Sequence, residues 1–236
     1  MFITRACFSV AFVVVSLFSI TGVAKGNIIT SWDFSSGTLA GWQPTGDVIS
    51  TDYPEMHNDY KNTWNLGIWN SQMRGDFALF HNTPGYLSTS IAITPDAVPY
   101  SLSMDYGVAW SYDPANTTDP HPYGYFYVET DGMTTDGKLH SLSYKEIDWG
   151  PSSSVAAKDV FTGSIFTEYF LQSSESAYKE FFINISVFNP NHSLDQLVAI
   201  DNVTLSVVPT PVPSPIVLFS FGLAGLIMFG LKFKRC

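Results

Sequence analysis

Cysteine is nearly missing from this chain of 236 residues. Its two cysteines, Cys7 and Cys236, stand close to the two ends. A domain built from the residues between them therefore has no thiol nucleophile and no disulfide to cross-link it. About 180 residues still bury enough surface to form a core without such a cross-link.

Charged residues are also scarce, and most of them are acidic. They make up 14% of the chain, compared with about 25% in a typical soluble domain. All 21 acidic residues lie between Asp33 and Asp201, and only six Lys or Arg lie in the segment 27–208, whose formal charge is −15. A nucleic-acid-binding protein needs a basic patch to meet phosphates. The charge balance therefore excludes that class.

Catalytic sequence patterns are absent as well. The chain has no Gly-x-Ser-x-Gly nucleophile elbow, and its five histidines show no His-x-x-x-His or similar metal-binding spacing. No catalytic residue is therefore assigned. A pair of carboxylates for glycoside hydrolysis stays open, because only geometry identifies such a pair among 21 acids.

Both ends of the chain have the composition of membrane-active segments. Residues 1–24 have a basic start, an apolar run and small residues before Ala24, which predicts a signal peptide cleaved after Ala24 or after Gly26. At the other end, residues 216–231 form an apolar run of about 24 Å as a helix. The tail 232–236 adds Lys232, Lys234 and Arg235. This predicts a transmembrane helix with a cytoplasmic tail; the alternative is a buried C-terminal helix.

The segment between these ends predicts one all-β domain over residues 27–207. Side chains alternate with period two, and Asn, Asp, Gly and Pro clusters separate the runs. About nine or ten strands without strong helical runs predict an antiparallel two-sheet β-sandwich or jelly roll. The spacer 208–215, with four alternating prolines, follows as an extended segment. The clearest strands are expected at 28–34, 76–80, 86–93, 100–110, 123–130, 139–146, 160–171, 181–188 and 198–207.

The C-terminal segment resembles a PEP-CTERM sorting signal. Val208, Pro209, Thr210 and Pro211 are followed by the apolar run and the basic tail, in the order of that family; Thr210 stands where the family usually has Glu. The resemblance implies a Gram-negative bacterium and export across the inner membrane. It also implies cleavage near the proline motif by an exosortase, a membrane protease that transfers the protein to the cell surface. The family's association with exopolysaccharide implies a matrix partner.

The domain itself resembles jelly-roll, carbohydrate-binding-like modules. The segment 32–42 is similar to their first strand, 87–89 and 102–107 to their middle strands, and 200–205 to their last strand. Such modules often hold a structural calcium through an acid near the first strand and the Asp of the last. The resemblance therefore implies a calcium site at Asp33 and Asp201, although Ser35 stands where the family's usual Glu would be. A second acidic group, Glu129, Asp131 and Asp136, favours a hairpin turn over a cation site.

Aromatic residues, 15% of the chain, supply candidates for glycan contact. The apolar face of a sugar ring can pack on an exposed aromatic ring. Trp64, Trp69, Trp110 and Tyr112 lie in loop-like stretches together with Tyr60 and Tyr123. The alternative is that these rings fill the sandwich core.

The combined prediction is a non-enzymatic bacterial protein of the cell surface or extracellular matrix. It is exported, held transiently by its C-terminal helix, processed by an exosortase and associated with exopolysaccharide. The alternatives are a specific glycan-binding module, a glycan-cleaving enzyme, and an unprocessed single-pass membrane protein.

Overall fold

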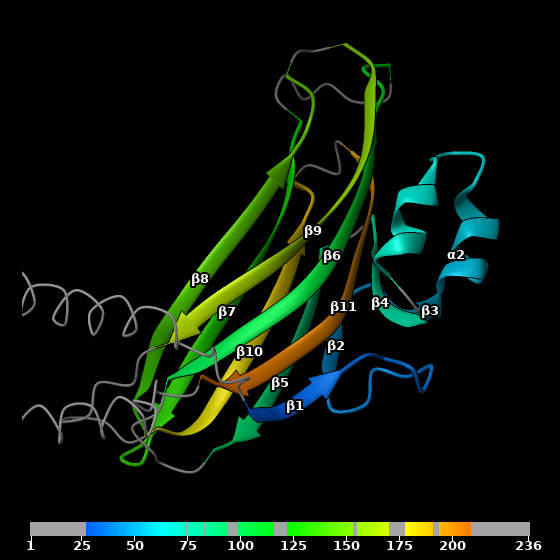
Figure 1. Ribbon diagram of the computed structural model, residues 1–236. Helices are drawn as coiled ribbons and strands as arrows, with labels where there is room; N and C mark the ends of the chain where they lie inside the picture. Colours follow the sequence, from blue (N-terminus) through cyan, green and yellow to red (C-terminus); the bar gives the residue numbers. More distant parts are fainter. Residues whose placement is uncertain are drawn as a thin grey trace, which may run out of the picture. The chain divides into compact units, whose positions relative to one another are not determined.

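The computed structural model describes residues 27–73, 75–82, 84–93, 99–115, 122–152, 155–169, 178–190 and 194–208. Two antiparallel sheets form a jelly-roll β-sandwich (Figure 1). The six-stranded sheet has the order β3 (Val48–Asp52), β4 (Asp76–His81), β11 (Asp195–Val207), β6 (Tyr100–Tyr112) and β9 (Ala157–Tyr169), and β1 (Asn27–Trp32) also pairs with β11. The five-stranded sheet has the order β2 (Gln43–Thr45), β5 (Gly85–Ala92), β10 (Tyr178–Phe188), β7 (Gly124–Thr134) and β8 (Leu139–Trp149).

The predicted all-β sandwich is confirmed for these residues. Every expected strand is present, with ends shifted by a few residues, and the short strands β2 and β3 are additional. No helix among the described residues is long and apolar enough to cross a membrane. The predicted signal peptide (1–24), residues 209–215 of the spacer, the apolar run 216–231 and the tail 232–236 lie outside the described residues.

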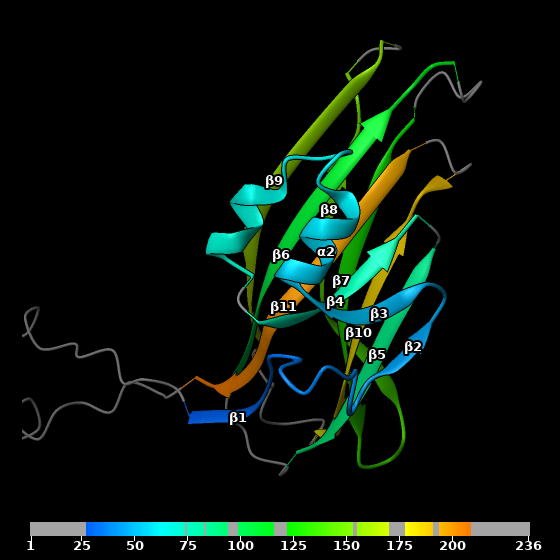
Figure 2. The same cartoon turned by 90° about the vertical axis from the view of Figure 1, so that its right-hand side faces the viewer.

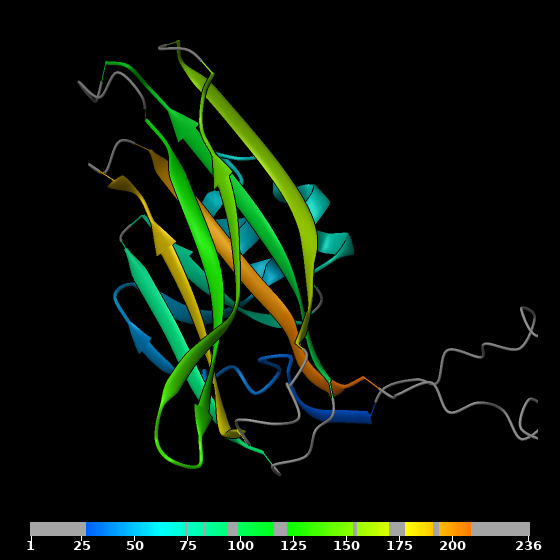
Figure 3. The same ribbon diagram turned by 90° about the vertical axis from the view of Figure 1, so that its left-hand side faces the viewer.

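The main core lies between the two sheets and follows from strand alternation. Successive side chains of a strand point to opposite faces. On β7, Phe126 and Val128 are buried in this core, whereas the neighbouring Tyr125 and Tyr127 are only half-buried. Val198 and Ile200 on β11 close the core from the other sheet. The five-stranded sheet therefore presents an outward face, which Figure 3 shows in front of the other sheet and the helices.

The helical insertion, residues 53–73, differs from the prediction of a helix-free domain. It contains α2 (Tyr53–Tyr60) and the 3-10 helix η1 (Leu66–Ser71). The Asp52 carboxylate caps α2 by accepting the Glu55 N–H at 2.8 Å. The insertion covers the outer surface of the six-stranded sheet (Figure 2). A second core is formed between the insertion and this sheet. It contains Met56, Trp64, Leu66, Trp69 and Met73 of the insertion and Phe77, Leu79, Ala109, Leu197 and Ala199 of the sheet.

Replacement of Gly124 by alanine is expected to destabilise the domain by about 1–3 kcal/mol through overpacking. A Cβ at Gly124 would lie 2.4 Å from Gln196 Oε1 and 2.5 Å from Trp149 Nε1. These two atoms form a buried hydrogen bond of 3.2 Å. Urea unfolding followed by tryptophan fluorescence measures the loss. Gly67→Ala is the control, because the nearest atom to its new Cβ lies at 3.4 Å; equal losses in both variants would contradict the steric explanation.

Candidate glycan-binding face

The four aromatic residues expected to contact glycans are core residues. Trp64 and Trp69 are 3% and 0% exposed in the second core, beneath the helical insertion. Trp110 and Tyr112, 6% and 4% exposed, lie in the core between the sheets. None of them offers a ring face to a ligand. The expectation of an exposed platform at these positions is therefore wrong, and the alternative of core packing holds.

Exposed and half-buried rings instead gather on the outward face of the five-stranded sheet. Tyr125 stacks against Tyr123 with ring centroids 5.9 Å apart and against Phe188 at 5.1 Å. Tyr127 stacks on the same Phe188 at 5.8 Å and lies 5.2 Å from the tilted ring of Tyr144. These five residues, the aromatic row, come from β7, β8, β10 and the segment before β7. Tyr123 and Tyr144 at its two ends are 48% and 55% exposed.

Strand register explains how residues far apart in sequence form this row. Phe188 on β10 pairs with Tyr125 on β7, while Glu129 on β7 pairs with Tyr144 on β8. Because directly paired residues point to the same face of a sheet, alternate residues of three strands line up on one surface. The sequence signal was Tyr at 123, 125 and 127, with apolar residues between and after them. Only Tyr123 was among the expected aromatic residues.

A polar group adjoins the aromatic row on the same face. The Tyr86 hydroxyl donates to Asn184 Oδ1 at 2.6 Å, and Asn184 Nδ2 donates to Asp131 Oδ2 at 3.1 Å. The Ser141 hydroxyl donates to Glu129 at 3.4 Å. These carboxylates and the amide keep lone pairs or N–H groups that sugar hydroxyls can use. The face thus combines apolar ring surfaces with acceptors and donors.

Electrostatics on this face reflect its many acidic groups. Burial, followed by the nearby charge of Glu129, raises the pKa of the Asp131 carboxyl above its usual value. The hydrogen bond that Tyr144 donates to Glu146 raises the pKa of Tyr144 to about 12. The tyrosine therefore stays neutral at pH 7, and its hydroxyl remains a donor.

The raised pKa of Asp131 predicts a pH-dependent effect of Asp131→Asn. A carboxyl whose pKa is higher in the folded state stabilises the protein below the unfolded pKa, and this contribution is lost as the pH rises through the folded pKa. The stability of Asp131→Asn relative to the wild type is therefore expected to be higher at pH 7 than at pH 3. Urea unfolding at both pH values measures this difference. Exposed Asp148→Asn on β8 is the control, and an equal pH response in both variants would contradict the burial effect.

Asp136 belongs to the turn between β7 and β8. The Gly137 N–H donates to the Thr134 carbonyl at 3.0 Å, and Gly137 has φ +86°, the left-handed conformation that glycine favours. The Thr134 hydroxyl bond, followed by the Lys138 interaction, lowers the pKa of Asp136 to about 2. The predicted hairpin turn is confirmed at Asp136. Glu129 and Asp131 lie within β7 instead.

Both acids of the predicted calcium site accept hydrogen bonds from neighbouring residues of the chain. Asp33 is exposed after β1, where hydrogen bonds from the Ser35 hydroxyl at 2.8 Å and N–H at 3.1 Å lower its pKa. Asp201 is fully buried on β11, and its Oδ1 accepts the Asn202 N–H at 2.7 Å. Within the described ranges, no three His, Cys, Asp or Glu side chains gather to hold a metal ion. The calcium site stays a prediction, and no chemistry is assigned to it.

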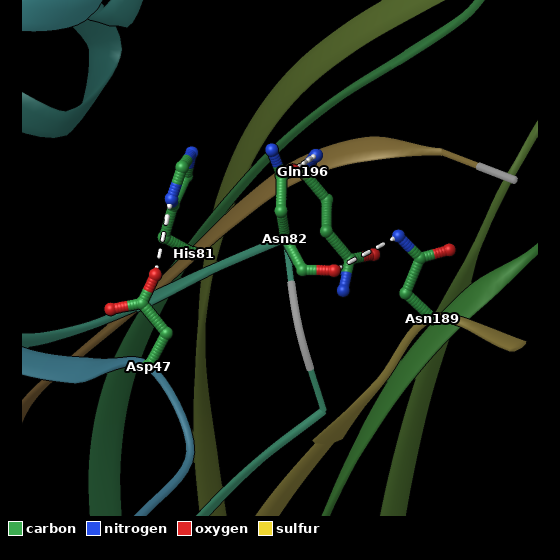
Figure 4. A network of polar contacts seen from close by, with 5 residues as sticks. All are labelled: Asp47, His81, Asn82, Asn189 and Gln196. Atoms are coloured by element: carbon green, nitrogen blue, oxygen red, sulfur yellow. Dashed lines mark hydrogen bonds and ion pairs between the residues drawn. The ribbon is translucent and has the colours of Figure 1, made fainter. Parts of the chain in front are cut away.

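A polar network joins β4, β10 and β11 where these strands end or begin (Figure 4). Asn82 Oδ1 accepts the Gln196 N–H at 2.7 Å, and Asn189 Nδ2 donates to the Asn82 carbonyl at 3.3 Å. His81 Nδ1 lies 3.3 Å from Asp47 Oδ2. The amides satisfy backbone groups and hold the strand ends in place. The network therefore supports the fold.

Of the expected sorting motif, only Val208 is described. Its N–H donates to the Pro99 carbonyl at 2.8 Å, directly after β11. Pro209, Thr210 and Pro211 lie outside the described residues, as do Lys232, Lys234 and Arg235.

Comparison of the sequence with models of protein families found no match, and comparison with curated proteins found none. Among solved structures, the chain is similar to TmCBM61 in complex with beta-1,4-galactotriose, at 13% identity and TM-score 0.38, covering 77% of this chain and 98% of that one. It is also similar to the xylan-binding domain from CBM 22, at 11% identity and TM-score 0.40, covering 80% and 100%. The CBM22 tandem of Paenibacillus barcinonensis Xyn10C gives 11% identity and TM-score 0.39, covering 82% and 48%. Values this low carry no functional inference.

Proposed function

We propose that residues 27–208 form a non-catalytic glycan-binding module whose contact surface is the outward face of the five-stranded sheet. The aromatic row is the observation that carries this proposal. Five rings lie side by side at centroid distances of 5.1 to 5.9 Å; their exposed surfaces, largest at Tyr123 and Tyr144, can pack against the apolar C–H faces of sugars. A row of rings suits a chain of sugars, because successive sugars can contact successive rings.

The polar neighbours of the aromatic row support the same function. Asn184, Asp131 and Glu129 lie beside the rings on a rigid sheet, where neighbouring side chains already fix their positions. Sites that combine apolar surface with a few fixed polar groups bind ligands in a defined orientation. In the proposed complex, these groups accept or donate hydrogen bonds to hydroxyls while the rings provide most of the contact area.

Affinity electrophoresis of the full chain tests this function. The protein is produced in a bacterium that exports it and is purified in mild detergent. Gels contain soluble β-1,4-glucan, xylan, β-1,4-mannan or β-1,4-galactan. Retardation by at least one polymer is the expected result, and full mobility in all of them would overturn the proposal. Release of reducing ends from a retarding polymer would replace binding with glycan cleavage.

The proposed location is the surface of a Gram-negative bacterium, reached by export and exosortase processing, with an exopolysaccharide as the partner. The apolar and basic ends of the sequence support it. The intact mass of the protein recovered from its native cells is the test. A mass that lacks residues 216–236 is expected. A mass that retains Lys232 to Cys236 would mean a permanent single-pass membrane protein.

A further inference from the structure

Around the aromatic row, the outward face of the five-stranded sheet carries charge of only one sign. By strand alternation and register, its outward positions on β5, β7, β8 and β10 include five carboxylates and, among the described residues, no Lys, Arg or His. Exposed Lys179 lies at the register irregularity between Tyr178 and Glu180 on β10, at the Met133 end of β7 and not at the Tyr125 end that carries the aromatic row. Lys145 pairs with inward-facing Val128, and Lys138 pairs with Asp136 in the turn at 3.0 Å. The carboxylates are Glu129, Asp131, Glu146, Asp148 and Glu180.

These carboxylates lie directly beside the aromatic row. Glu146 pairs with Tyr127 across β7 and β8, and Asp148 pairs with Tyr125. Asn184 pairs with Glu129 on the other side of β7. A sugar stacked on the central rings would therefore have Glu146 and Asp148 on the β8 side and Glu129 next along β7. Ionised carboxylates accept hydrogen bonds from hydroxyls but have no proton to donate.

We infer that this face selects uncharged glycan chains and rejects polyanionic ones such as polyuronates. The inference rests on the proposed glycan-binding function and adds the class of ligand. A uronate or sulfate group placed near the rings would meet several like charges and no compensating cation. At physiological ionic strength charges interact over a Debye length of about 8 Å, which is long enough to reach from a stacked sugar to these side chains. The exopolysaccharide partner would accordingly be a neutral one.

Matched polymers test the selection by charge. Each neutral glucan, mannan and galactan is compared with the same polymer oxidised at C6 to the uronate, so that the linkage stays constant. The full chain is run in low salt with a chelator, which prevents divalent cations from bridging carboxylates. Retardation at least tenfold weaker by the oxidised form is expected, with a smaller difference in 0.3 M salt. Equal or stronger retardation by the oxidised form would overturn the inference and leave glycan binding in place.

Failure of both forms to retard the protein would overturn glycan binding and, with it, this inference.

A double variant, Glu129→Gln with Glu146→Gln, tests whether this face causes the selection between neutral and oxidised polymers. It keeps the side-chain size and oxygen acceptors, and it is expected to reduce the neutral-to-oxidised ratio at least threefold. The control pair Asp159→Asn and Glu168→Gln removes two charges from exposed positions on β9 in the other sheet. An equal reduction in both double variants would overturn the assignment, since it would attribute selection to net charge.

Discussion

Replacement of Tyr127 by alanine is expected to weaken retention by a neutral polysaccharide about tenfold to thirtyfold. Tyr127 lies between two other rings of the row, with ring centroids 5.8 Å from Phe188 and 5.2 Å from Tyr144. Its removal takes away one stacking surface and the lateral support of two others. Apolar contact contributes roughly 25 cal/mol per Å². About 60–80 Å² of lost contact therefore corresponds to roughly 1.5–2 kcal/mol, and each 1.4 kcal/mol is about tenfold in affinity.

The control for this prediction is Tyr53→Ala. Tyr53 is half-buried like Tyr127, but it lies on α2 over the other sheet, where it stacks with His57. Affinity electrophoresis with the same polymer measures both variants, and urea unfolding confirms that each is folded. Unchanged retention of Tyr127→Ala, or an equal loss in Tyr53→Ala, would exclude the aromatic row as the contact surface.

The largest loss of stability is expected from Trp69→Ala, at about 3–5 kcal/mol, as for other fully buried tryptophans. Trp69 is 0% exposed and makes an edge-to-face contact with Phe77 at 6.4 Å. Its ring lies directly over Gly107 of β6, where even a Cβ would be only 2.8 Å from Trp69 Cε2. The ring fixes η1 to the six-stranded sheet, so its removal leaves a cavity under the insertion. Urea unfolding measures the loss, and Trp69→Phe is expected to lose less.

The Trp69→Ala variant also tests whether Trp69 is a core residue or a glycan-contact residue. Retention of Trp69→Ala by polysaccharide, measured under conditions where the protein stays folded, is expected to equal that of the wild type. The reason is that the aromatic row lies on the other sheet. Loss of retention with less than 1 kcal/mol of destabilisation would contradict the structure and return Trp69 to the binding site.

Local sequence patterns were sufficient to predict the described strands other than the short β2 and β3. Alternation along Leu102, Met104 and Tyr106, for example, indicated β6 directly. The helical insertion lacked such a pattern, because α2 has eight residues and buries only Met56. A helix this short is stabilised mainly by tertiary packing, which local sequence does not reveal.

The binding face was predictable only in part. Tyr125 and Tyr127 share one face of β7 by period two alone, and Tyr123 precedes them at the same spacing. Phe188 joins them only through the pairing of β7 with β10, whose register is not encoded near either strand. Trp64 and Trp69 were expected in exposed loops, because nothing local shows that the insertion folds back onto a sheet.

The position of the last strand has a mechanical consequence. β11 ends at Val207, yet it is an interior strand, bonded to β6 on one side and to β4 and β1 on the other. Inter-strand hydrogen bonds in antiparallel sheets run perpendicular to the strands. Tension applied at Val208 against a ligand held on the opposite sheet would therefore load β11 along its length. Many hydrogen bonds would resist it together, so that a domain tethered by its C-terminal end would withstand shear.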